Sequence, residues 1–300
     1  MGYENGNDNN FAARFMYHTV ARIKGGGARV RKAIWATSGA AVAATAELLR
    51  PADYTTWTDA DYLYVSFWAM VYNHTSTQVR PWVNIDNPTY PSSGLYHGPC
   101  YNAGLTKCIL YSGQRDSGFH NDYWDDTPTT VMGDAGDGTG QWDHLTWHHF
   151  CFSHSWNGSL WVDGKRTWYN SNQGEATWSV APDTNNGAQN LFLRIGGSAR
   201  SGSWQPLSDH FGVSNLSIWD PDGQDLSEFD DVEAIDPTDG AQDRFAAWCM
   251  NNPVDNTKSG LLWGWPMQAD LNDVGPHGKH LSLGAGTHAL NNGTYNGPVF

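Results

Sequence analysis

Two stretches of the chain place several aspartates close together in glycine-rich turns, a pattern that suits a hard metal ion. The first stretch contributes Asp220, Asp222 and Asp225. The second, GDAGDGTGQWD, contributes Asp134 and Asp137, with Asp143 close behind. Carboxylate oxygens in a tight turn are ligands that Ca²⁺ prefers, although the first stretch lacks the closing glutamate of an EF-hand loop. Both are candidate calcium sites, and ordinary Asp-Gly turns are the alternative explanation.

Histidines gather in one segment, at positions 144, 148, 149 and 154. His148 and His149 are neighbours in a strand-like alternation, so they point to opposite faces and do not share a metal ion. We expect His148 to be a hydrogen-bonded core residue. The sequence contains no Gly-x-Ser-x-Gly elbow and no phosphate-cradling glycine loop, so nothing indicates nucleophilic catalysis or phosphate binding by such motifs.

Tryptophan is unusually frequent, with 16 residues. Indole faces stack on the apolar faces of sugars while nearby polar groups bind the hydroxyls. Packing in the core of a large sandwich is the alternative use of these rings. The candidate glycan-binding residues, chosen because they lie in or beside predicted loops, are Trp124, Trp142, Trp156 and Trp204.

The elements that would position these residues are clearest between positions 141 and 169. His148, Phe150 and Phe152 alternate with Trp147, His149 and Cys151, which predicts a central β-strand. A second run, at 159–162, leads into Asp163-Gly164, a pair typical of a type I′ hairpin turn, and a third run covers 165–169. The sequence therefore predicts three consecutive antiparallel strands.

Other elements are predicted along the rest of the chain. A long loop is expected over 87–107, and a short helix over 220–233 with Asp225 or Ser227 as its N-cap. Otherwise the glycine-rich composition predicts strands and turns with little helix. The further predicted strands lie at 11–24, 28–37, 62–70, 79–85, 108–112, 176–180, 191–196 and 212–219.

These segments resemble the laminin-G-like, concanavalin-A-like jelly-roll family. The hairpin is similar to the family's signature hairpin, YLYVSFWAM at 62–70 to an early strand, and LFLRIGGSARSGSWQPLSDHFGVSNLSIWD at 191–220 to its Ile-Gly-Gly and closing strands. The resemblance spans about residues 39–285. It implies an all-β, antiparallel jelly-roll β-sandwich with an N-terminal extension. It also implies a first core strand within 39–50, where alanine-rich composition alone favours a helix, and returning strands at 261–268 and 280–283.

The resemblance raises two site hypotheses. Related β-glucanases carry two glutamates and an aspartate on one strand, and Glu228, Asp230, Asp231 and Glu233 approach that spacing. This segment follows the closing strand in a helix-like turn, so we expect an acidic surface helix without catalysis. Laminin-G-like modules often hold calcium in rim loops, which supports the aspartate clusters. The fold hosts lectins, adhesion modules, glycanases and viral surface proteins alike, so it does not by itself indicate a function.

Charge divides the chain into two unlike parts. Of its 300 residues, positions 1–38 contain six basic and two acidic residues, a net charge of +4, whereas the whole chain has −14 and the remainder therefore −18. The acidic body argues against binding of nucleic acid or an anionic membrane, and no apolar run is long enough to insert into a membrane. We interpret the basic segment as a docking arm for an acidic protein surface, with a solvated hairpin as the alternative. Its basic residues are Arg14, Arg22, Lys24, Arg29, Arg31 and Lys32.

Domain limits and compartment follow from the same sequence. We expect a basic arm at 1–38, one jelly roll at 39–284 and a Gly/Asn-rich tail at 285–300. The four cysteines are too few for a disulfide framework; Cys100 and Cys108 could bridge a loop, but reduced thiols are favoured. The polar first residues do not resemble a secretory signal, so release by host lysis is one expected route.

Together these observations lead to the hypothesis of a non-enzymatic attachment or decoration protein on a larger assembly. The expected assembly is a virion, with the protein as a phage capsid decoration or fibre component. The arm would anchor the protein, and the jelly roll would bind cell-surface glycans, with Ca²⁺ as the one expected cofactor. The alternatives are a glycoside hydrolase, a polysaccharide lyase or a free-standing lectin on the same fold.

Overall fold

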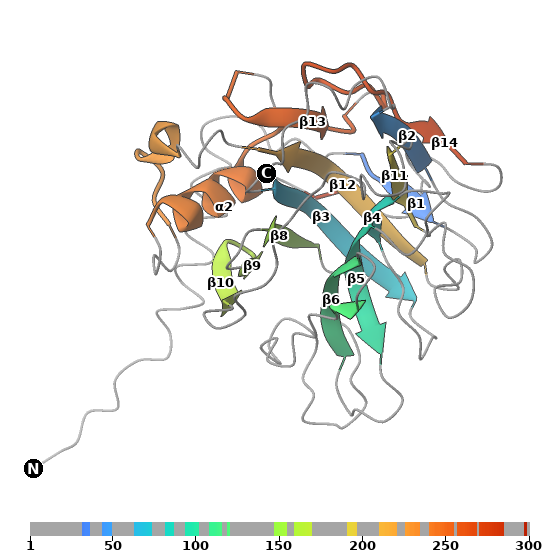
Figure 1. Cartoon of the computed structure of the whole chain (residues 1–300), viewed down its shortest axis with the longest axis horizontal. Helices are drawn as coiled ribbons and strands as arrows, with labels where there is room; N and C mark the ends of the chain where they lie inside the picture. The colour runs from blue at the N-terminus through green and yellow to red at the C-terminus, as the bar shows by residue number, and fades with distance from the viewer. Residues whose placement is uncertain are drawn as a thin grey trace, which may run out of the picture.

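In the part of the chain that the structure describes, two antiparallel sheets of seven strands each form the body of the protein. Figure 1 shows the computed structural model of the chain. The predicted all-β antiparallel jelly-roll sandwich is confirmed by these sheets. The structure describes residues 32–36, 44–49, 63–73, 82–86, 94–101, 108–115, 119–120, 147–154, 159–169, 191–196, 210–220, 226–234, 240–254, 257–268, 270–284 and 297–298.

The first sheet contains the hairpin that the sequence predicted. Its order is β1-β12-β3-β8-β9-β10, and β13 also pairs with β12. β8 pairs with β3 on one side and β9 on the other, as expected for a central strand. The strands are β1 (Ile34–Ala36), β3 (Leu63–Asn73), β8 (His148–His154), β9 (Ser159–Val162), β10 (Lys165–Tyr169), β12 (His210–Trp219) and β13 (Leu261–Trp265).

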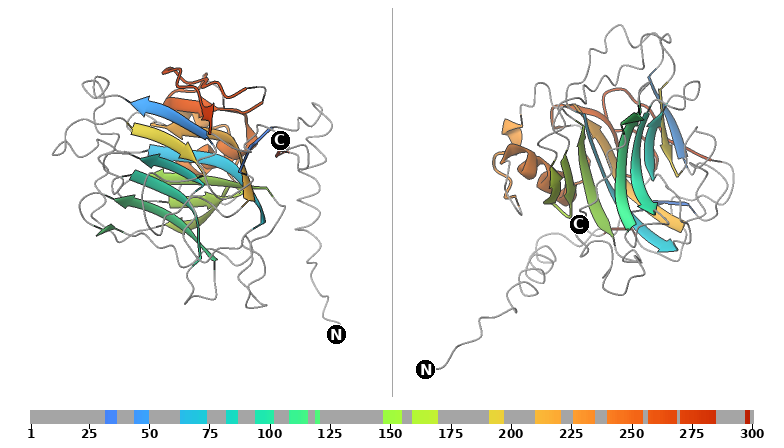
Figure 2. Two further views of the ribbon diagram at one scale, coloured as in Figure 1. Left: turned by 90° about the vertical axis from the view of Figure 1, so that its right-hand side faces the viewer. Right: turned by 60° about the horizontal axis from the view of Figure 1, so that its bottom comes forward.

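The second sheet lies against the first and has the order β14-β2-β11-β4-β5-β6-β7. Figure 2 shows its strands in front of those of the first sheet in the left-hand view. The strands are β2 (Ala44–Leu49), β4 (Val83–Asp86), β5 (Gly94–Tyr101), β6 (Cys108–Arg115), β7 (Phe119–His120), β11 (Leu191–Ile195) and β14 (Ser282–Leu283).

The core between the sheets is rich in aromatic rings. Phe67 of β3 stacks on Phe152 of β8 with ring centroids 5.8 Å apart, and its edge meets Trp82 at 6.3 Å. Leu193 and Ile195 of β11 are fully buried in the same cluster. Burial of side chains of this size contributes about 1.5–3 kcal/mol each, so the sandwich is held mainly by this layer.

The Asp163-Gly164 turn has the geometry that the sequence predicted. Both residues have positive φ, 51° and 75°, as a type I′ turn requires. Asp163 and His149 exchange two hydrogen bonds: the Asp163 backbone N–H donates to the His149 carbonyl at 2.9 Å, and Asp163 Oδ1 accepts from the His149 N–H at 2.9 Å. The turn is therefore fixed by the side chain as well as by backbone pairing.

Residues 39–50 contain a strand, β2, as predicted against their helical propensity. Ala44, Ala46 and Leu48 are buried in the core, while Thr45 and Glu47 are half-buried on the other face. The period of two is thus present beneath the alanine-rich composition, and burial in the sandwich outweighs propensity.

The loop predicted over 87–107 is wrong, because β5 lies inside it. β5 pairs with β4 over residues 94–97 and with β6 along its whole length. Pro99 lies beyond the part that pairs with β4, so its missing N–H interrupts no hydrogen bond on that side. Two glycines and this proline have low strand propensity, so propensity alone did not predict β5.

The helical segments also differ from the prediction. The helix expected over 220–233 is a single turn, η5 (Ser227–Phe229), whose N-cap is Leu226 instead of Asp225 or Ser227. A longer helix, α2 (Ala241–Asn251), was not predicted. Its signal is present in the sequence, since Phe245, Trp248 and Cys249 recur at helical spacing and are buried.

A bulge in β12 holds the chain that leaves α2. Asn215 adopts a φ of 51° at the point where the register with β3 shifts. Its side-chain amide donates to the Asn252 carbonyl at 3.1 Å and accepts from the Val254 N–H at 3.0 Å. The strands predicted at 11–24 and 176–180 lie outside the described residues.

Candidate functional site

The outer face of the first sheet is closed by a helical layer. Its outward residues include Tyr64, Cys151, Trp161 and Trp219, which form a second apolar cluster with α2 and η5. Phe245 of α2 packs edge-on against Tyr64 at 4.9 Å and Trp219 at 5.6 Å. Figure 1 shows α2 lying outside the first sheet, beside β8, β9 and β10.

A buried ion pair fastens this layer to the sheet. Asp243 of α2 is completely buried, and its Oδ1 accepts a hydrogen bond from Trp161 Nε1 at 2.7 Å. The same oxygen lies 3.2 Å from Nε of Arg166, whose guanidinium carbon is 5.1 Å from the Trp161 ring centroid. The outer face of the first sheet is therefore occupied by the protein itself.

The outer face of the second sheet is different, because none of the described helices lies over it (Figure 2). Strand alternation places Thr45 and Glu47 of β2, Phe192 and Arg194 of β11, and Asn84 of β4 on this face. In register, Phe192 stands beside Glu47, and Arg194 stands between Thr45 and Asn84. This cross-strand group is the candidate functional site.

The backbone pairing of β4 continues onto the next strands. Asn84 pairs with Tyr96 of β5, which pairs with Gly113 of β6. One row further on, Asp86 pairs with Gly94, which pairs with Arg115. The backbone register thus aligns positions of β2, β11, β4, β5 and β6 in two rows.

The chemistry of the described residues suits a sugar. Phe192 is half-buried, with the guanidinium carbon of Arg194 5.5 Å from its ring centroid. An aromatic face takes the apolar face of a sugar ring, while carboxylate, guanidinium and amide groups bind its hydroxyls. The group offers the guanidinium of Arg194 and the carboxylate of Glu47 beside one ring, whereas Asn84 on the next strand is completely buried.

The tryptophans predicted to bind glycans, Trp124, Trp142, Trp156 and Trp204, all lie outside the described residues. Sequence reasoning missed the group on β2, β4 and β11. The signal was available, because Phe192 and Arg194 alternate with Leu193 and Ile195 in a strand that was itself predicted. What the sequence did not show was which of the two outer faces a helix covers.

The predicted calcium sites fall largely outside the described residues, which exclude Asp222, Asp225, Asp134 and Asp137. Asp220 is half-buried at the end of β12, and its backbone N–H donates to the Gly260 carbonyl at 2.7 Å. In the part of the chain that the structure describes, no three His, Cys, Asp or Glu side chains form a group able to hold a metal.

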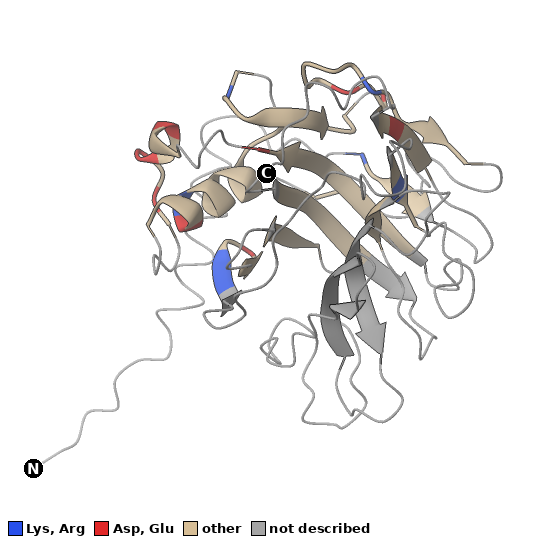
Figure 3. Ribbon diagram, in the orientation of Figure 1, with Lys and Arg blue, Asp and Glu red and all other residues tan. Residues whose placement is uncertain are grey.

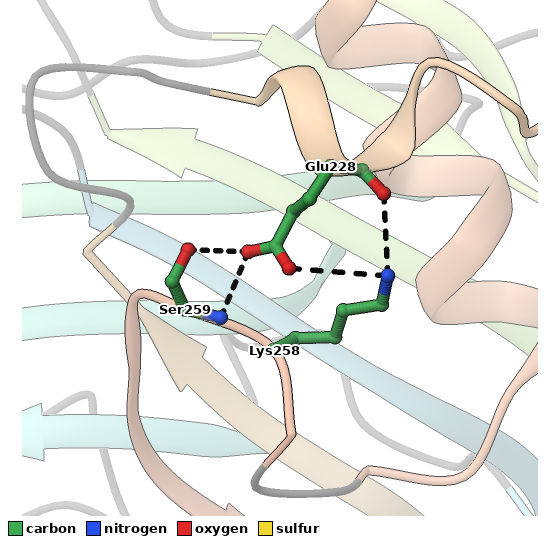
Figure 4. Close-up of polar contacts among 3 residues, drawn as sticks. All are labelled: Glu228, Lys258 and Ser259. Atoms are coloured by element: carbon green, nitrogen blue, oxygen red, sulfur yellow. Dashed lines mark hydrogen bonds and ion pairs between the residues drawn. The ribbon is translucent and has the colours of Figure 1, made fainter.

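The acidic segment 228–233 lies in the single turn η5 and the residues that follow it, where the sequence predicted a surface helix. Glu228 Oε1 accepts a hydrogen bond from the Ser259 backbone N–H at 2.8 Å and a short one from its hydroxyl (Figure 4). Asp230 pairs with Arg244 at 2.8 Å. Figure 3 shows these acids gathered at η5, beside the start of α2. Two of the carboxylates thus hold loops together, and none lies on a strand as a glucanase site requires.

The two adjacent histidines face opposite sides of β8, as predicted. His148 Nδ1 lies 2.7 Å from Asp163 Oδ2, which confirms a hydrogen-bonded role. His149 Nε2 lies 2.9 Å from the Ser66 hydroxyl, and burial lowers the pKa of His149 to about 3, so its ring is neutral. Cys151 and Cys249 are free and buried, which agrees with reduced thiols. The side chains of Cys100 and Cys108 lie outside the described part.

Most of the basic arm also lies outside the residues that the structure describes, including Arg14, Arg22, Lys24, Arg29 and Arg31. Its last residues are part of the body. The Lys32 carbonyl accepts a hydrogen bond from the Ser214 hydroxyl at 2.6 Å, and β1 pairs with β12. Trp35 of β1 lies over Gly212, where a Cβ would come within 2.8 Å of the indole ring.

No family model and no curated protein matches the sequence. Among solved structures, a Bacteroides ovatus protein assigned as carbohydrate-binding aligns with TM-score 0.47 and 12% identity, covering 88% of this chain and 63% of that one. The CBM40 module of a Ruminococcus gnavus IT-sialidase bound to sialyllactose aligns with TM-score 0.39 and 11% identity, covering 61% and 89%. Domain 4 of a Geobacillus stearothermophilus GH43 arabinanase bound to arabinotriose aligns with TM-score 0.28 and 16% identity, covering 52% and 61%. The chain thus spans less than two thirds of the length of the first of these proteins, and the fold class rests on its own two sheets.

Proposed function

We propose that this protein is a carbohydrate-binding β-sandwich whose glycan site is the outer face of the second sheet. One observation carries the proposal: Phe192, Arg194 and Glu47 form a half-buried aromatic and charged group on a face that no described helix covers. Phe192 supplies the stacking surface, and the flanking groups bind hydroxyls and select among sugars. The role is one of binding without catalysis, since the acidic segment at η5 is engaged in loop contacts.

Glycan-array screening of the full chain tests this proposal. Phe192→Ala removes the stacking surface, and we expect a roughly five- to thirtyfold loss of affinity for whichever glycan the chain captures, because stacking on an aromatic ring contributes roughly 1–2 kcal/mol. Asp231→Ala, an exposed change at η5 on the other side of the sandwich, is the matched control and leaves binding intact. Unchanged binding by Phe192→Ala refutes this site.

The finer proposal is attachment to, or decoration of, a larger assembly such as a virion. It is supported by the opposite charges of the two parts of the chain, with a basic residue set before β1 and an acidic body. Residues 1–31 would anchor the protein on an acidic protein surface, leaving the second sheet available for glycans. Among the described residues, no helix has the length and apolar character to cross a membrane.

Mass measurement in solution tests the anchoring role. The full chain is compared with a chain that lacks residues 1–31, which keeps β1 and its pairing with β12. A defined oligomer that is lost on truncation supports the arm as an assembly element. If both chains are monomers, their binding to an acidic capsid protein is compared next. Binding by the full chain alone supports the anchoring role, and equal binding by the two chains refutes it.

A further inference from the structure

Two aromatic rings and a carboxylate surround the ammonium group of Lys258 beside η5. Phe229 and Trp248 meet at a corner, with ring centroids 5.3 Å apart and planes at 62°. Lys258 Nζ lies 5.1 Å from the Phe229 centroid and 5.8 Å from the Trp248 centroid. Both distances are within the range of a cation–π interaction. We call Phe229, Trp248 and Glu228 together the aromatic corner.

Glu228 supplies the oxygen atoms of the corner. Its backbone carbonyl accepts a hydrogen bond from Lys258 Nζ at 3.2 Å, and its Oε2 lies 3.9 Å from the same nitrogen (Figure 4). Ser259 holds the other carboxylate oxygen through its N–H and its hydroxyl. The carboxylate is therefore positioned independently of Lys258, and it stays in place if the ammonium group leaves.

The rings are also positioned by other parts of the fold. Phe229 packs against Phe245 at 5.0 Å, and Trp248 packs against Trp219 at 5.7 Å. Phe229 and Trp248 are buried, whereas the side chain of Lys258 is 26% exposed. Lys258 thus lies between the aromatic corner and solvent, and its side chain is a flexible four-carbon chain with a strongly hydrated end.

We propose that the aromatic corner is a recognition site for the substituted ammonium group of a ligand, and that Lys258 is its built-in occupant, which the ligand displaces. Quaternary ammonium groups of the choline type are the class that aromatic faces with a nearby carboxylate recognise. They are less strongly hydrated than the Lys258 ammonium, so exchange returns Lys258 to water and brings the poorly hydrated cation to the rings. This site lies outside the first sheet and does not depend on glycan binding at the second.

Equilibrium dialysis of the full chain against radiolabelled choline tests the proposal. We expect saturable binding by the wild-type chain and roughly tenfold tighter binding by Lys258→Ala, because the internal competitor is gone. Adding Trp248→Leu to Lys258→Ala removes one of the two faces and reverses that gain. Lys258→Met keeps an unbranched neutral chain over the corner, and we expect its affinity to stay below that of Lys258→Ala.

Stability provides a second readout that separates binding from folding. Choline raises the melting temperature of Lys258→Ala, whereas sodium chloride at equal ionic strength does not. If the alanine variant does not fold, Lys258→Gln takes its place with the same expected results. The proposal is overturned if the wild-type chain or the folded variant shows no saturable binding, if their affinities are equal, or if the Trp248→Leu double variant keeps the gain.

Discussion

The buried ion pair beneath α2 makes the stability of the helical layer testable. Asp243 has no exposed surface, and its Oδ1 contacts both Trp161 Nε1 at 2.7 Å and Arg166 Nε at 3.2 Å. Asp243→Asn keeps the shape of the side chain and an oxygen that accepts from Trp161. It removes only the negative charge beside the guanidinium of Arg166, whose side chain is 9% exposed.

The expected loss is large because the charge that remains is buried. Breaking a buried ion pair from one side costs about 3–5 kcal/mol. Since the Trp161 hydrogen bond survives, we expect Asp243→Asn to lie at the lower end, about 3 kcal/mol. The matched control is Asp230→Asn, which breaks the 2.8 Å pair with Arg244 at a side chain that is 60% exposed. An exposed pair of this kind contributes about 0–1 kcal/mol.

Urea unfolding at pH 7, followed by tryptophan fluorescence, measures both variants. The Asp243→Asn midpoint should fall well below that of Asp230→Asn with little change in the slope of the transition. Adding Arg166→Met to Asp243→Asn removes the buried guanidinium as well and should recover part of the loss. Losses that agree within about 1 kcal/mol for Asp243→Asn and Asp230→Asn would refute the buried-charge reasoning.

Three further predictions concern other parts of the fold. Deleting residues 1–38 removes β1 and Trp35 and should lower the melting temperature markedly below that of the chain that lacks only residues 1–31. Equal melting temperatures of the two shortened chains would contradict a structural role for β1. The pKa of His149 is about 3 in the folded protein and near 6.5 in the unfolded chain. The stability that this residue contributes is therefore full above pH 6.5 and falls by about 1.4 kcal/mol per pH unit below it. His149→Gln should reduce this slope, as measured by urea titrations at pH 7 and pH 5. In the same assay Asn215→Ala should destabilise the protein by about 1 kcal/mol more than Asn215→Gly. Both variants lose the amide hydrogen bonds, but only alanine resists a φ of 51°. The reverse order would show that the backbone at this bulge carries no such constraint.

The sequence predicts the strands best where one period governs the whole segment. β8 is the clearest case, since Phe150 and Phe152 enter the core while His149 and Cys151 face the helical layer. β5 was missed because glycine and proline hide its pairing, which depends on β4 and β6 on either side. Local patterns carry no information about such neighbours, so this part of the fold required the structure.

The candidate site shows the same limit. The alternation that exposes Phe192 and Arg194 is visible in five residues of sequence. Among the described helices, α2 docks on the other sheet, through the contact between Trp161 and Asp243, which are 82 positions apart. Long-range contacts of this kind decide which outer face can bind a ligand, and no window of sequence contains them.

The two outer faces differ in composition, and this difference separates stability from binding. On the first sheet the outward side chains are mainly apolar, so they require a cover, and α2 provides it. On the second sheet the outward side chains of Thr45, Glu47 and Arg194 are polar and half-buried, so they can contact water. Changes beneath α2 should therefore lower stability while leaving glycan affinity intact in the protein that remains folded. Phe192→Ala should lower glycan affinity while leaving stability intact. If the folded fraction of Asp243→Asn loses glycan binding, the assignment of the site to the second sheet is wrong.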